Sequence, residues 1–237
     1  MENKTVMITG ASKGLGKALA IALSKKGYQL SICARGKEEL DNVHATLLEN
    51  GADVLAVQAD ASEKDDIERF VSMTEERFNK IDVLINNASY LGSSPIPYLL
   101  DFNHEEYKEV MRVNAEGPFL MMKRVLPGMV QRGTGSVINV TSAAGATGYA
   151  GWGIYGVSKF ALEGLTETWA DELRSSGVSI NIVDPGEMDT DMHALAVPDC
   201  DYHLASPSSV TDVFLYLADE ASVTGQRLEA QAFTGGE

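Results

Sequence analysis

Short runs of apolar and β-branched residues alternate along the chain with longer segments in which apolar residues recur at helical spacing. The short runs predict strands, and the near-continuous apolar character of Val83–Ile85 indicates a strand that is buried on both faces of a parallel sheet. Six strands are expected at Thr5–Thr9, Tyr28–Ala34, Asp53–Gln58, Val83–Asn86, Ser136–Val140 and Ser179–Val183, with a seventh near Arg227–Ala230. The alternation predicts an α/β chain with helices on both faces of the sheet.

The segments with helical spacing predict six helices. They are expected at Gly14–Lys26, Lys37–Asn50, Glu63–Phe78, Glu105–Arg132, Tyr155–Ser175 and Ser208–Leu217. Ser62 is the expected N-cap of the third helix, because Asp65 and Asp66 follow it in the first turn. Helix C-termini are expected before Gly27, Gly51 and Gly177.

No internal repeat, low-complexity tract or linker interrupts this alternation, and 237 residues suit one α/β domain. Residues 1–237 are therefore expected to form a single Rossmann-type, doubly wound domain with a mainly parallel seven-stranded sheet. Two irregular stretches, about 89–102 and 185–207, follow strands on the side where such sheets bind ligands. We expect both to contact the substrate, with His193 a solvated loop residue.

Composition adds limits on partners and location. The net charge of −15 argues against a nucleic-acid partner, since phosphate backbones attract basic surfaces. Cys33 and Cys200 match no metal-binding spacing, so free thiols and no metal site are expected. Met1–Lys4 does not resemble a leader, and no stretch approaches the ~20 apolar residues that span a bilayer. The sequence thus predicts a cytoplasmic protein without a membrane partner.

A glycine-rich segment links the first expected strand to the first expected helix. Its spacing, Gly10-x-x-x-Gly14-x-Gly16, permits a tight turn and a close approach of the backbone to a pyrophosphate at the helix N-terminus. A merely structural turn is the alternative, but the preceding strand and following helix favour a dinucleotide site. The predicted cofactor contacts in this segment are Gly10, Ser12, Lys13, Gly14, Leu15 and Gly16.

The end of the second strand bears on the choice of cofactor. An NAD enzyme usually has a carboxylate there, whereas this strand ends in Arg35-Gly36 with no carboxylate before Glu38. Arg35 and Lys13 would attract a 2′-phosphate, so NADP(H) is the expected cofactor, although both side chains would also suit a solvated surface. Asp60 and Ala61, after the third strand, are further candidates for cofactor contact, and Asp60 also suits a helix cap or a loop.

Several residues with catalytic chemistry follow in order. Tyr155 and Lys159 are four residues apart, so both would share one face of a helix. Taken alone, this pair suits ordinary packing, Ser142 suits a turn and Asn114 suits a buried amide. In combination they resemble the short-chain dehydrogenase/reductase family over nearly the whole chain. The matching motifs are Thr9–Gly16, Asn86–Ala88, Asn114, Ser142, Tyr155-x-x-x-Lys159, Pro185-Gly186 and Thr190.

The resemblance implies an NADP(H)-dependent oxidoreductase that interconverts a small-molecule carbonyl and alcohol. Tyr155 would be the general acid and base, and the Lys159 ammonium would lower the pKa of its phenol. Ser142 would bind the substrate oxygen, and Asn114 would hold a water that connects Lys159 to solvent. Cofactor contacts are also implied for Tyr155 and Lys159 themselves and for Asn87, Ala88, Pro185, Gly186 and Thr190.

The resemblance further implies a homodimer or homotetramer. The chain departs from the family in Ser89, where glycine is usual, and in the sequence after Leu228. Two alternatives remain open: an NAD-linked alcohol dehydrogenase of the same family, and a non-catalytic dinucleotide-binding sensor. Arg35 argues against the first, and the presence of both Tyr155 and Lys159 argues against the second.

Overall fold

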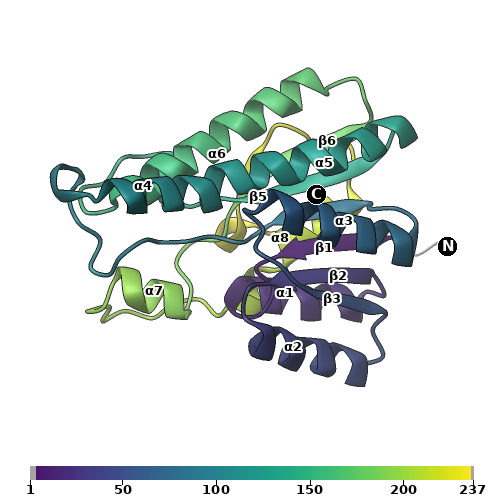
Figure 1. Ribbon diagram of the computed structural model, residues 1–237, viewed down its shortest axis with the longest axis horizontal. Helices are drawn as coiled ribbons and strands as arrows, with labels where there is room; N and C mark the ends of the chain where they lie inside the picture. Colours follow the sequence, from purple (N-terminus) through teal and green to yellow (C-terminus); the bar gives the residue numbers. More distant parts are fainter. Residues whose placement is uncertain (1–3, 236–237) are drawn as a thin grey trace.

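The computed structural model describes residues 4–235 and contains a seven-stranded sheet whose neighbouring strands are all parallel (Figure 1). The strands are β1 (Thr5–Thr9), β2 (Gln29–Ala34), β3 (Val54–Gln58), β4 (Val83–Asn86), β5 (Gly135–Val140), β6 (Val178–Asp184) and β7 (Arg227–Glu229). Their order is β3-β2-β1-β4-β5-β6-β7, so the direction of winding reverses between β1 and β4. The expected doubly wound α/β fold is confirmed. Residues 1–3 of the predicted N-terminus and residues 236–237 lie outside the described part.

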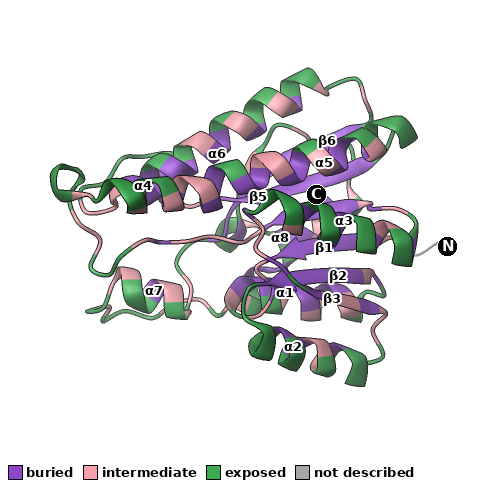
Figure 2. Cartoon of the chain, in the orientation of Figure 1, coloured by how far each residue is buried: buried purple, intermediate pink, exposed green. Residues whose placement is uncertain are grey.

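Helices cover both faces of this sheet (Figure 1). They are α1 (Gly14–Lys25), α2 (Lys37–Glu49), α3 (Lys64–Phe78), α4 (His104–Met111), α5 (Gly117–Arg132), α6 (Gly153–Glu172), α7 (Asp191–Ala196) and α8 (Asp212–Asp219). Helices α1, α2 and α8 share one apolar cluster with the sheet, whereas α3, α5 and the end of α6 share the other. The central strands are buried, the edge strands β3 and β7 are partly exposed, and the helices expose only their outer sides (Figure 2). Each helix therefore shields one apolar stripe, as its sequence spacing predicts.

The helix expected over Glu105–Arg132 is interrupted. A π turn at Arg112–Glu116 separates α4 from α5, and the Gly117 N–H donates to the carbonyl of Arg112. Pro118 supplies a physical reason, because it has no N–H to donate to the carbonyl four residues earlier. The single-helix prediction was wrong at this point.

Two other local predictions need correction. Ser62 does not cap α3: the N-cap position is Glu63, and the Ser62 hydroxyl donates instead to Asp60 Oδ1. The stretch 185–207 contains a short helix, α7, whose N-cap Thr190 accepts a hydrogen bond from the His193 N–H at 3.2 Å. Among residues 4–235 no helix is long and apolar enough to cross a membrane.

Candidate active site

A cleft of about 980 Å³ opens at the carboxyl ends of the strands. It lies at the reversal point between β1 and β4, where doubly wound sheets bind ligands. The predicted site residues on its surface are Gly10, Ser12, Lys13, Gly14, Leu15, Arg35, Asp60, Ala61, Asn87, Ala88, Ser142, Tyr155, Lys159, Pro185, Gly186 and Thr190. Gly16 and Asn114 are not on this surface, and both lie behind residues that are.

The glycine-rich segment is fixed to the end of β4. Asn87 Nδ2 donates to the carbonyls of Thr9 and Gly10 at 2.9 and 3.0 Å. The main-chain N–H groups of Asn87 and Ala88 donate to Thr9 Oγ1, each at 3.0 Å. Gly10 has a φ of +67°, and a Cβ there would meet the Cα of Ala88 at 2.8 Å. Only glycine allows this approach, which presents the start of α1 to the cleft.

The outer end of the cleft carries charges of both signs. Arg35 lies at its surface, as expected, and Lys13 Nζ is 3.2 Å from Asp191 Oδ2 with both side chains largely exposed. The sequence interpretation missed Glu39, which also lines the cleft. The Glu39 carboxylate packs so closely on Gly36 that a side chain at position 36 would collide with it. Its place in the first turn of α2, four residues after Arg35, was the available signal.

Asp60 also lies on the cleft but already has protein partners. Its Oδ1 accepts hydrogen bonds from the main-chain N–H and the hydroxyl of Ser62, and its Oδ2 is 3.7 Å from Arg112 Nη2. The carboxylate therefore anchors the loop that precedes α3. A contact from Asp60 to a cofactor stays a prediction.

Tyr155, Lys159 and Ser142 converge at the inner end of the cleft. Tyr155 and Lys159 lie on α6, and the Lys159 Nζ is 5.5 Å from the centre of the Tyr155 ring. Lys159 is almost completely buried and donates to the carbonyl of Val140 at 3.0 Å. Ser142 follows β5, and its Oγ accepts from the Ala144 N–H at 3.3 Å. The sequence spacing thus brought the expected side chains to one place.

Burial moves the pKa values of Tyr155 and Lys159 apart. Burial raises the pKa of the Tyr155 phenol to about 12, hydrogen bonds with Ser142 and Ser89 oppose the rise, and Asp184 adds to it. Burial lowers the pKa of Lys159 to about 8, against the attraction of Asp184 and Glu163. The expected lowering of the phenol pKa is therefore not found among these side chains. The Lys159 ammonium lies over the ring and bonds to the main chain.

Asn114 acts behind the cleft as a connector. Its side-chain oxygen accepts from the Tyr90 N–H at 2.7 Å and from the Ser89 hydroxyl at 3.1 Å. Its amide nitrogen donates to the Tyr90 carbonyl and to Ser158 Oγ on α6. The π turn therefore directs one amide toward both the loop after β4 and helix α6. Ser89, the departure from the family pattern, joins this network.

The part of the cleft nearest Tyr155 is apolar. Leu91, Trp152 and Met192 pack with Tyr155 and come from both expected substrate loops and from the start of α6. The two loops also touch directly, because Ser94 Oγ donates to the Leu195 carbonyl at 2.7 Å. These contacts favour an apolar substrate surface next to the phenol.

His193 corrects another expectation. It is buried rather than solvated, and it lies on the cleft with its Nε2 3.6 Å from Glu187 Oε1. Its ring meets the Tyr202 ring edge-on at 6.4 Å. The prediction was wrong because α7, which the sequence pattern did not reveal, turns the side chain inward.

Comparison with other sequences finds one family along most of the chain. The family model described as short chain dehydrogenase matches residues 4–201. A 3-oxoacyl-[acyl-carrier-protein] reductase of Synechocystis sp. is 35% identical over 233 residues, which cover 94% of this chain and 93% of the relative. A protein of the same name from Staphylococcus epidermidis is 33% identical and covers 80% of this chain and 77% of its own.

Solved structures agree with this finding. An actinorhodin polyketide ketoreductase variant with NADPH has a TM-score of 0.89 and 30% identity, covering 96% of this chain and 95% of its own. A 3-ketoacyl-(acyl-carrier-protein) reductase of Brucella melitensis, complexed with NADH, has a TM-score of 0.89 and 25% identity, covering 96% of both chains. The two neighbours thus differ in the dinucleotide named with them.

Proposed function

Because the chain belongs to the short-chain dehydrogenase family and is an oxidoreductase, we propose that it is an NADP(H)-dependent reductase of small-molecule carbonyls. Tyr155 exchanges the proton of the reaction, in either direction. One observation carries the proposal: Ser142, Tyr155 and Lys159 share a single cleft with the glycine-rich segment. A dinucleotide site and a proton-exchanging group are thus adjacent.

The residues of the cleft suit a dinucleotide. The glycine-rich segment and the start of α1 offer main-chain N–H groups to a pyrophosphate, and Arg35 offers a forked cation to a 2′-phosphate. Pro185, Gly186 and Thr190 line the same cleft as Tyr155, and Thr190 lies close to Gly14 at the start of α1. A bound nicotinamide supplies or accepts the hydride, and these residues would hold it facing the apolar part of the cleft.

The chain's own groups then handle the substrate oxygen. Ser142 donates a hydrogen bond that holds a carbonyl oxygen near the Tyr155 hydroxyl and polarises it. Tyr155 delivers the proton as negative charge builds on that oxygen, and its pKa of about 12 keeps the phenol protonated for reduction. Lys159 places a buried cation beside the ring, and Asn114 holds the loop that carries Ser89.

The substrate class follows from the apolar wall and from the relatives. Leu91, Trp152 and Met192 suit an aliphatic or aromatic ketone, and the named relatives act as 3-oxoacyl-[acyl-carrier-protein] reductases. We include 3-oxoacyl thioesters in the proposed range. A cytoplasmic location and a homodimer or homotetramer belong to the proposal as well. Exposed apolar side chains at Tyr98, Leu99 and Phe160 support self-association.

The test is NADPH oxidation with a panel of ketones, aldehydes and 3-oxoacyl thioesters. Tyr155→Phe keeps the ring and removes the proton, so it should lower kcat by about 10²-fold or more with little change in dinucleotide affinity. Equal rates for wild type and Tyr155→Phe would overturn the proposed role. Wild type and variant equally inert, yet still binding dinucleotide, would favour the non-catalytic sensor instead.

An NAD-linked enzyme is the second candidate, and Glu39 is the observation that favours it. Its carboxylate lies on the cleft close to Arg35 and would repel a 2′-phosphate. Comparing kcat/KM for NADPH and NADH with one substrate distinguishes the two. A preference for NADH would replace the proposed cofactor and leave the role of Tyr155 unchanged.

A further inference from the structure

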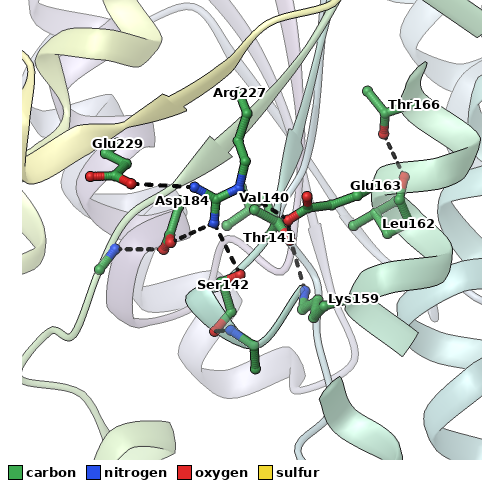
Figure 3. A network of polar contacts seen from close by, with 12 residues as sticks. Val140, Thr141, Ser142, Lys159, Leu162, Glu163, Thr166, Asp184, Arg227 and Glu229 are labelled. Atoms are coloured by element: carbon green, nitrogen blue, oxygen red, sulfur yellow. Dashed lines mark hydrogen bonds and ion pairs between the residues drawn. The ribbon is translucent and has the colours of Figure 1, made fainter. Parts of the chain in front are cut away.

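Arg227 lies on β7, directly behind the catalytic residues (Figure 3). Its Nη2 donates to Asp184 Oδ2 at 2.8 Å and to the main-chain carbonyl of Ser142 at 3.3 Å. Its Nε donates to Glu163 Oε1 at 3.3 Å, and its Nη1 is 3.5 Å from Glu229 Oε1. One guanidinium thus joins the end of β5, the end of β6 and α6.

The contacts with Ser142, Asp184 and Glu163 each connect Arg227 to a part of the proposed site. The Ser142 carbonyl belongs to the residue whose hydroxyl is proposed to bind the substrate oxygen. Asp184 Oδ1 accepts from the Gly186 N–H at 2.9 Å, so the carboxylate also holds the segment that lines the nicotinamide end of the cleft. Glu163 is one helical turn after Lys159 on α6 and accepts from Thr141 Oγ1 at 2.7 Å.

The charges in this network are largely shielded from water. The side chains of Asp184 and Glu163 are 9% and 11% exposed, and that of Arg227 is 26% exposed. Without a counter-charge, two buried carboxylates would act strongly on the nearby Lys159 cation and on the Tyr155 phenol, because the surrounding dielectric is low. Arg227 is the cation that contacts both carboxylates among the described residues.

We propose that Arg227 is a positioning and charge-balancing residue of the active site. Its single positive charge offsets part of the negative charge of Asp184 and Glu163 behind the Tyr155–Lys159 pair, and its contacts fix Ser142 relative to the Pro185–Gly186 segment. Its catalytic consequence rests on the proposed reductase function. The electrostatic effect of Arg227 on Lys159 concerns the protein without cofactor and can be tested separately.

A purely structural ion pair is the competing explanation, and the titration of Lys159 distinguishes the two. Arg227→Met leaves the two carboxylates uncompensated, so the Lys159 ammonium is stabilised and its midpoint should move to higher pH by about one pH unit. Arg227→Lys keeps a positive charge and should shift the midpoint less. The measurement is the ¹³C resonance of the lysine Cε in labelled protein without cofactor, with Lys159→Arg identifying the signal.

Arg124→Met is the matched control. Arg124 also bridges two carboxylates, Glu68 and Glu75, but it does so between α5 and α3, away from the cleft. Arg124→Met also removes one positive charge, and it should leave the titration midpoint of Lys159 unchanged. An unchanged midpoint in Arg227→Met, or an equal shift in Arg124→Met, would overturn the proposal.

Asp184→Asn provides a second variant of nearly the same shape. It removes one negative charge near Lys159, so the Lys159 midpoint should move to lower pH, opposite to Arg227→Met. The double variant Arg227→Met with Asp184→Asn should return toward wild type. A shift to higher pH or no shift in Asp184→Asn also overturns the proposal, even if Arg227→Met does not fold.

The kinetic readout separates this inference from the proposed function. If the protein reduces carbonyls, the alkaline limb of kcat/KM should move to higher pH in Arg227→Met, in parallel with the Lys159 midpoint. Absence of reductase activity in every variant, with the resonance shifts as expected, would reject the proposed function and retain the charge-balancing role. Activity with unshifted resonances would reject the charge-balancing role alone.

Discussion

The two halves of the cleft hold their charges in opposite ways. On the β1–β3 side, main-chain groups and exposed side chains face the cleft, and Lys13 is 70% exposed although it pairs with Asp191 of α7. On the β4–β7 side, Lys159 is 2% exposed and the Asp184 side chain 9% exposed. Water screens the interactions between charges in the first half, whereas burial strengthens these interactions in the second. Substitutions should therefore change affinity modestly on one side and proton binding strongly on the other.

The largest expected effect concerns Lys159 and stability. Its pKa is about 8 in the folded protein, below the ordinary lysine value of 10.5, so between these values the unfolded chain binds more protons. Stability should therefore rise with pH in this window, by about 2 kcal/mol from about pH 8 to about pH 10. Urea unfolding should show that Lys159→Met lacks this gain. The exposed Lys25→Met should behave as wild type, and a matching loss there would contradict the assignment to Lys159.

Arg35 should give the next largest effect. Arg35→Gln removes a screened cation at the outer end of the cleft, so the KM for NADPH should rise about tenfold with little change for NADH. Steady-state kinetics at two salt concentrations measures the KM for NADPH and the KM for NADH. Added salt should reduce the difference between the two KM values in the wild type, since the proposed contact between Arg35 and the 2′-phosphate is exposed. Equal effects on both dinucleotides would mean that Arg35 does not recognise a 2′-phosphate.

A substitution at Ser89 should have a smaller effect, on the buried half of the cleft. Ser89→Gly restores the usual family residue and removes one hydroxyl that lowers the pKa of Tyr155. The more alkaline limb of kcat/KM, which Tyr155 contributes above that of Lys159, should move to higher pH by about half a pH unit, the equivalent of one hydrogen bond. Ser93→Gly, in the same loop, is the control. A profile that does not move would separate Ser89 from the acidity of Tyr155.

Glu39 should give the smallest effect. Glu39→Gln removes a carboxylate from the outer end of the cleft, and the preference for NADPH over NADH should increase about twofold, the size expected for a solvated charge. The ratio of the two kcat/KM values is the measurement. Glu38→Gln is a neighbouring control, and an equal change there would indicate a general effect of net charge.

The sequence predicted the fold because each strand and helix carries its own periodic signal. The order of the catalytic residues and the glycine spacing were also local patterns, and the structure gathers nearly all of them on one cleft. The pairing of Arg227 with Asp184 was not predictable, because it joins residues 43 positions apart through the packing of β6 and β7. The direction of the Tyr155 pKa depends on burial, which no spacing of residues reports.

The π turn at Arg112–Glu116 has a consequence for helical phase. One extra residue in a turn rotates everything after it by about 100° relative to a regular helix. A deletion of one residue within this turn would make α4 and α5 a continuous helix and carry the Asn114 amide away from Tyr90 and Ser158. The helix would then be regular, but the Asn114 side chain would lose these hydrogen bonds. The π turn thus sets the rotation of the helix at which the Asn114 amide reaches Tyr90 and Ser158.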